Sequence, residues 1–120
     1  MPDSPTHLRK VQHNRTLIAA LDPATTPYLD WVVTVVFYAA LHRIEAWFAG
    51  KGLHLEAHTE RDDWLSKTKE LRRIVWPRYK ELEFQRRQAR YECIPFERVF
   101  VQNHLLPVLD EIEREMQSLA

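Results

Sequence analysis

The chain has 120 residues, of which 45% are hydrophobic and 28% are charged, with equal numbers of acidic and basic side chains. This length suits one domain spanning residues 1–120, and the composition is that of a globular protein. Two glycines are too few for an all-β fold rich in tight turns, and a single cysteine excludes an internal disulfide.

The apolar segments are too short to indicate a membrane protein. The first ten residues are polar and lead into no apolar signal-peptide core. The longest apolar run, Trp31–Leu41, covers eleven residues and is interrupted by Thr34. A membrane-spanning helix needs about 20 apolar residues. We therefore expect a buried helix, no membrane association and a cytoplasmic location.

The first half of the chain predicts two helices. Residues Thr6–Leu21 form the first, because Leu8, Val11, Ile18 and Leu21 recur at helical spacing and Asp22-Pro23 follows. Residues Tyr28–Ala49 form the second, with Thr26 as its N-cap and Pro27 at its first position. Valines in this segment favour a strand, but twenty-two residues without Gly or Pro are too long for one.

The second half predicts three more helices. One begins at the N-cap Thr59 and reaches about Ile74, and a strongly charged one covers about Arg78–Tyr91. The last covers about Phe96–Ser118, and Pro107 is expected to kink or divide it. Because the connections are short, we expect an all-α, four- to five-helix, up-and-down antiparallel bundle.

The charges are unevenly distributed along the chain. Residues 61–90 contain ten Lys or Arg and five Asp or Glu, a balance of +5, whereas the rest of the chain has a balance of −5. One interpretation is that these are ordinary solvated helix faces. The other is that the basic segment contacts phosphate groups.

The second predicted helix carries a polar stripe in an otherwise apolar segment. At 100° per residue its members lie within about 120° of one another. They are Asp30, Thr34, Tyr38, His42 and Glu45. The stripe either forms hydrogen bonds inside the bundle or lines a pocket or dimer seam, with His42 able to titrate near neutral pH.

Two further groups could bind anions. His58 and Arg61 flank a predicted helix N-terminus, which favours an anion site, although a plain cap with a surface histidine explains the same pattern. Arg90 and Tyr91 combine a phosphate donor with a stacking face. Arg90 would equally stabilise the C-terminus of a helix through its dipole.

One pair suggests catalysis. Arg98 and His104 are separated by five residues, and an arginine that binds phosphate beside a histidine acid or base suits metal-free RNA cleavage. This spacing also arises by chance in many helices. His54 and His58 are spaced like half a zinc site but have no cysteine partner, so we expect no metal and no cofactor.

Several spaced blocks together resemble a branch of the HEPN (higher eukaryotes and prokaryotes nucleotide-binding) superfamily. They are Asp30-Trp31-Val32-Val33-Thr34, Phe37-Tyr38-Ala39-Ala40-Leu41-His42, His58-Thr59-Glu60-Arg61 and Ala89-Arg90-Tyr91-Glu92, preceded by His13-Asn14. The resemblance implies a compact helical bundle, frequently a homodimer, in toxin–antitoxin, defence or RNA-processing systems. Its recurring residues in this chain are His42, His58, Arg61, Arg90 and Tyr91.

Three functions are consistent with this resemblance. The first is a dimeric module that binds RNA or a nucleotide, with a nucleotidyltransferase or an antitoxin as partner. The second is a metal-independent endoribonuclease that uses the Arg98-x5-His104 motif. The third is a purely structural dimerisation protein, in which the polar stripe forms the seam.

Overall fold

The computed structural model describes residues 2–119, and every regular element in that range is helical. The elements are α1 (Ser4–Leu21), α2 (Leu29–Gly50), α3 (His58–Lys67), α4 (Val75–Arg90), α5 (Arg98–Phe100), a π-helical segment η1 (Val101–Leu105) and α6 (Leu106–Ser118). Because α5, η1 and α6 follow one another without a break, they form one C-terminal helix. The prediction of an all-α fold is confirmed.

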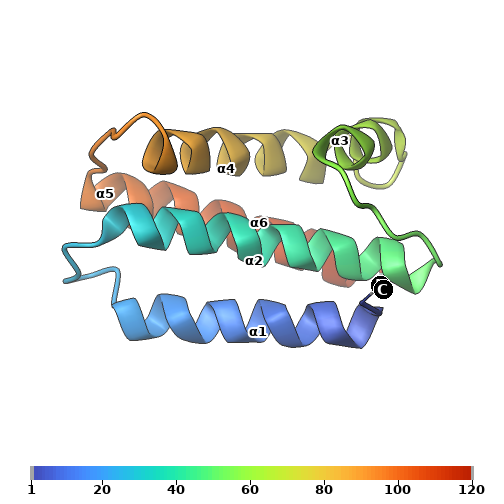
Figure 1. Ribbon diagram of the computed structural model, residues 1–120, viewed down its shortest axis with the longest axis horizontal. Helices are drawn as coiled ribbons and strands as arrows, with labels where there is room; N and C mark the ends of the chain where they lie inside the picture. The colour runs from blue at the N-terminus through green and yellow to red at the C-terminus, as the bar shows by residue number, and fades with distance from the viewer. Residues whose placement is uncertain (1, 120) are drawn as a thin grey trace.

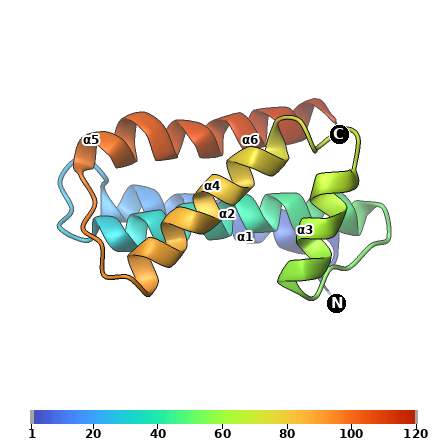
Figure 2. The same ribbon diagram turned by 90° about the horizontal axis from the view of Figure 1, so that it is seen from above.

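The long helices are arranged around α2, which packs against α1, α4 and α6. In Figure 1, α1 and α4 lie on opposite sides of α2, and consecutive long helices run in opposite directions. Figure 2 shows that α4 crosses α2 obliquely and that α3 lies near the C-terminal half of α2. This arrangement is a helical bundle in which α2 is the central element.

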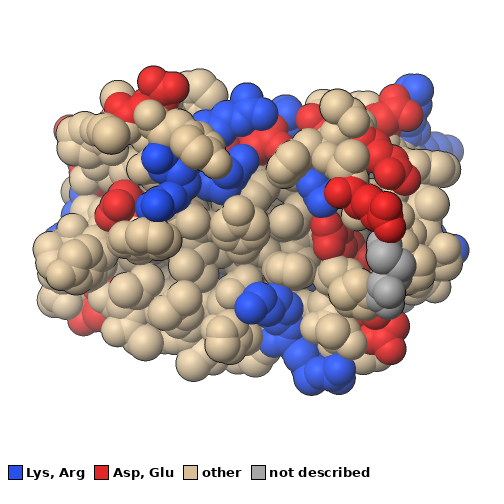
Figure 3. Space-filling model, viewed as in Figure 1, with Lys and Arg blue, Asp and Glu red and all other residues tan. Residues whose placement is uncertain are grey.

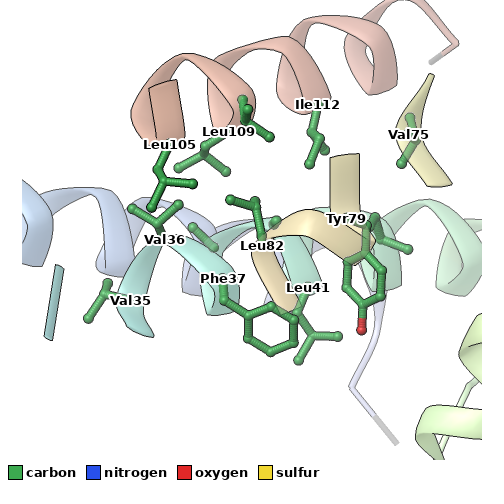
Figure 4. Packing of buried hydrophobic residues seen from close by; sticks show 14 of the residues in the cluster. Val35, Val36, Phe37, Leu41, Val75, Tyr79, Leu82, Leu105, Leu109 and Ile112 are labelled. Atoms are coloured by element: carbon green, nitrogen blue, oxygen red, sulfur yellow. The ribbon is translucent and has the colours of Figure 1, made fainter. Parts of the chain in front are cut away.

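The core explains why the valine-rich segment is a helix. Val36 and Phe37 of α2 are fully buried against α4 and the C-terminal helix (Figure 4). A helix that is apolar around most of its circumference is stabilised by packing on several sides, and this outweighs the strand preference of valine. By length and composition α2 could also cross a membrane, but 67% of its most apolar stretch is buried inside the bundle.

The structure corrects the predicted start of α1 and shows which of its residues are buried. The helix begins at Ser4 rather than Thr6, because the Asp3 side chain accepts a hydrogen bond from the Thr6 backbone N–H at 2.9 Å. Leu8, one of the apolar residues whose spacing predicted this helix, is 38% exposed. The buried residues of α1 are His7, Val11, Asn14 and Ile18.

Other predicted helix starts were also wrong. Thr26 is not the N-cap of α2, because its hydroxyl accepts from the Tyr28 backbone N–H and the helix begins at Leu29. Helix α3 begins at His58, one residue before the predicted cap Thr59.

The predicted break between the third and fourth helices was misplaced as well. Helix α3 ends at Lys67 rather than Ile74, since the backbone of Thr68 is extended and its hydroxyl donates to the Trp64 carbonyl. Helix α4 then begins at Val75, so Pro77 lies in its first turn, where a missing N–H costs little.

The C-terminal helix accommodates Pro107 without being divided. It begins at Arg98 rather than Phe96, and the π-helical segment η1 lies just before the proline. There the Leu106 backbone N–H bonds to the Val101 carbonyl, five residues earlier. We infer that this wider turn relieves the contact between the proline ring and the preceding turn.

Candidate functional site

Four ionisable side chains from α1, α2 and α3 meet beside the C-terminal half of α2. We call His7, His42, Glu45 and Arg61 the Glu45 cluster. Arg61 is buried, and its Nη2 donates to Glu45 Oε1 at 2.6 Å. The other oxygen of Glu45, Oε2, lies 3.5 Å from His7 Nδ1. Charged side chains are seldom buried unless paired, so this ion pair fixes α3 against α2.

Two histidine rings face each other within the cluster. His7 Nδ1 and His42 Nδ1 are 3.0 Å apart. Burial lowers the pKa of His42 below its ordinary value, although the nearby Glu45 carboxylate opposes this shift. His42 and Glu45 share one face of α2 because they are three residues apart. A surface hollow lined also by Thr6, Arg9, Lys10 and His13 opens onto both histidines.

A second charged group holds α3 against α4. Lys80 Nζ bridges Asp62 Oδ2 at 2.9 Å and Glu83 Oε1 at 2.5 Å, and Glu83 is buried. His58 connects this group to the Glu45 cluster, because its Nδ1 lies 3.2 Å from Arg61 Nη1 and 3.8 Å from Glu83 Oε2. Burial also raises the pKa of the Tyr79 phenol, which packs among these charges and the core.

Arg90 and Tyr91 lie at the other end of α2. The Arg90 guanidinium is 3.9 Å from the centre of the Trp31 ring, and Tyr91 is 72% exposed. Trp31 and Glu45 are separated by about 21 Å along the axis of α2. The structure therefore brings His42, His58 and Arg61 together around Glu45, whereas Arg90 and Tyr91 form a separate surface.

Arg98 and His104 contact different parts of the chain. Arg98 donates to the backbone carbonyls of Pro23 and Thr26 at 2.7 and 2.9 Å, which fixes the loop between α1 and α2. The exposed His104 places its Nε2 2.5 Å from Glu81 Oε2 on α4. Within one chain, then, the two side chains of the Arg-x5-His motif have different hydrogen-bond partners and do not form one site.

The polar stripe of α2 is divided rather than continuous. His42 and Glu45 join the Glu45 cluster, but the Thr34 hydroxyl donates to the Asp30 carbonyl of its own helix. Tyr38 is 40% exposed. The stripe is therefore buried at Thr34, half-buried at His42 and Glu45, and open to solvent at Tyr38.

Sequence reasoning missed His7, which completes the pair with His42. It was overlooked because the first helix was predicted from the spacing of its apolar residues alone. The series His7, Val11, Asn14 and Ile18 has the spacing of one helix face, so admitting polar residues would have identified it. Glu83 and Arg86 were also missed, and both are charged residues buried on α4.

No family model, curated protein or solved structure matches this chain. The HEPN resemblance therefore stays a prediction from the sequence.

Proposed function

We propose that this protein is a HEPN-like module that binds RNA or a nucleotide. In this proposal it acts as a cytoplasmic homodimer, in a toxin–antitoxin or defence system, beside an antitoxin or a nucleotidyltransferase. The observation that carries the proposal is the placement of Arg90 over the Trp31 ring next to the exposed Tyr91. A cation held on an aromatic face, with a second ring free in solvent, suits a base stacked beside its phosphate.

The surface around this group supports the proposal. Figure 3 shows Lys and Arg side chains over α4 and again over α1, with a largely uncharged strip over α2 between them. Trp31, Tyr38 and His42 follow one face of α2 at helical spacing, and the first two are 46% and 40% exposed. A single strand could thus lie along α2 with its bases on aromatic rings and its phosphates near the flanking cations.

Arg90→Ala and Tyr91→Ala are expected to weaken binding of a short single-stranded RNA at low salt. A stacked base contributes about 1–3 kcal/mol, so the Kd of Tyr91→Ala should rise at least about fivefold. Arg90→Ala should also flatten the dependence of the Kd on salt, since one phosphate contact is lost. Fluorescence anisotropy with a labelled oligonucleotide measures both effects.

The matched control is Arg73→Ala. Arg73 is an exposed cation in the same basic segment, and it takes part in none of the cation–aromatic contacts described for residues 2–119. Its loss should change the Kd far less than the loss of Arg90. Equal effects of the two substitutions, or no RNA binding by the wild-type protein, would contradict the proposal.

The ribonuclease alternative is favoured by one observation at His104. Glu81 orients this ring, and both residues line a surface hollow together with Arg78 and Asn103. A histidine held by a carboxylate near an arginine is an arrangement that can transfer protons during RNA cleavage. Arg98 is bound to backbone carbonyls outside this hollow, whereas Arg78 lines the hollow and pairs there with Glu111, so a phosphate would have to compete with the Glu111 carboxylate for Arg78.

If this alternative holds, the purified protein should cleave RNA in the presence of EDTA, and His104→Ala should lower the rate about 100-fold or more. Gel analysis of a labelled RNA gives the rate. His54→Ala, which changes another exposed histidine, is the control and should cleave normally. Cleavage that persists in His104→Ala would remove His104 from the mechanism.

A further inference from the structure

We propose that His7, His42 and Glu45 bind a divalent transition-metal ion of the zinc type. One donor atom from each residue lies within 4.8 Å of the other two. This site goes beyond the proposed RNA-binding function, because it would bind a metal ion at the junction of α1 and α2, where His7 and Glu45 join His42 of the proposed RNA-binding face.

The donor distances suit a small metal ion. Ligand nitrogens and oxygens lie about 2.0–2.2 Å from zinc, which puts neighbouring donors of a tetrahedral site about 3.3 Å apart. Here the two Nδ1 atoms are 3.0 Å apart, and His7 Nδ1 is 3.5 Å from Glu45 Oε2. A hydrogen bond between the imidazoles would use one proton to join the two nitrogens, whereas a metal ion would engage all three donors at once.

The chemistry of the donors favours zinc, cobalt or nickel over calcium or magnesium. Two imidazole nitrogens and one carboxylate oxygen are typical ligands of the former group, whereas the latter prefer oxygen alone. His7 is buried and His42 is half-buried, so neither ring is a freely moving surface group. His42 and Glu45 come from successive turns of one rigid helix, and α1 supplies the third ligand.

Arg61 orients the Glu45 carboxylate toward the proposed metal site. It donates to Oε1 at 2.6 Å, which leaves Oε2 directed toward His7. Residues that orient a ligand in this way are a regular part of protein metal sites. Arg61 also carries positive charge, as does Lys10 in the hollow beside the histidines, so both cations reduce the affinity for the ion.

A surface hollow gives the proposed ligands access to solvent. The hollow that opens onto His7 and His42 is lined also by Thr6, Lys10 and His13. Three protein ligands with one position open to solvent characterise sites that exchange water or a small ligand. The site therefore provides both an entry path for the ion and room for a bound water molecule.

The test uses the full chain after treatment with EDTA and desalting. Calorimetric titration with Zn²⁺ should show about one equivalent bound, and Co²⁺ should give the intense visible absorption of a four-coordinate site. His7→Ala and His42→Ala should each weaken binding about tenfold or more. The controls His13→Ala, in the wall of the hollow, and His54→Ala, on the surface, should retain the wild-type affinity.

Two results would overturn this assignment. One is the absence of stoichiometric binding by the wild-type chain, and the other is unchanged binding after either ligand is removed. If His7→Ala and His42→Ala fail to fold, paramagnetic NMR of the wild-type chain decides instead. Co²⁺ should then broaden the ring signals of His7 and His42 before those of His13 and His54. Broadening of all histidines together would also refute the site.

Discussion

Replacing Arg61 with alanine is expected to lower the free energy of unfolding by about 3–5 kcal/mol. The side chains of Arg61 and Glu45 are 7% and 14% exposed, and they form a direct ion pair at 2.6 Å. Removing the guanidinium leaves the largely enclosed Glu45 carboxylate without its strongest partner, and the cost of that unpaired charge is the main contribution to the loss of stability. Urea unfolding followed by far-UV circular dichroism measures the change.

A neighbouring ion pair supplies the control. Lys67 and Asp63 also involve α3, but their side chains are 72% and 58% exposed. Lys67→Ala should change stability by at most about 1 kcal/mol, since water and salt screen exposed pairs.

The double variant Arg61→Met, Glu45→Gln separates loss of the pair from loss of packing. It removes both charges while keeping similar volumes, and it should recover much of the stability lost in Arg61→Ala. If Arg61→Ala destabilises no more than Lys67→Ala does, the buried pair does not have the role assigned to it. The prediction also shows why Arg61 is a poor choice for an RNA-binding test, because its loss would disturb the fold.

Phe37→Ala is expected to lower the free energy of unfolding by about 3–5 kcal/mol. The Phe37 ring is fully buried on α2, and its centre lies 5.6 Å from that of Tyr79. The Arg86 guanidinium lies 4.8 Å from the centre of the same ring. Truncation would therefore leave a cavity at the centre of the bundle and remove the aromatic face beneath a buried cation.

Phe84→Ala is the matched control for this second prediction. Phe84 lies on α4, but it is 55% exposed. Its truncation should change stability by about 0.5 kcal/mol or less, as for most surface substitutions. A loss from Phe84→Ala equal to that from Phe37→Ala would mean that Phe37 is not packed in the core around α2.

The comparison between prediction and structure is most informative at the ends of the helices. Length and the absence of Gly and Pro were sufficient to predict α2 over nearly its full extent, despite its valines. The end of α3 was not predictable in this way, because residues up to Ile74 continue a plausible helical pattern. The helix ends because the backbone of Thr68 is extended and the Thr68 hydroxyl donates a hydrogen bond to the Trp64 carbonyl. The spacing of apolar residues does not predict either feature.

The candidate site was predicted only in part. His42, His58 and Arg61 were selected from the sequence, and they do meet around Glu45. His7 was not selected, because the first helix was predicted from its apolar residues alone, and its contact with His42, thirty-five residues away, depends on the packing of two helices. Arg98 was selected as a phosphate-binding residue, but in the structure its guanidinium donates to two backbone carbonyls of a loop.

The polar stripe on α2 shows what each level of information contributes. The sequence by itself determined that the chain is helical and that His42 and Glu45 share a face, because helical periodicity is a local property. Only the tertiary structure decided that His7 of α1 and Arg61 of α3 contact Glu45. It also decided that Tyr38 of the same stripe remains exposed. Contacts between helices depend on how the faces of those helices pack. The local spacing of residues along one helix does not specify which residues of another helix will contact it.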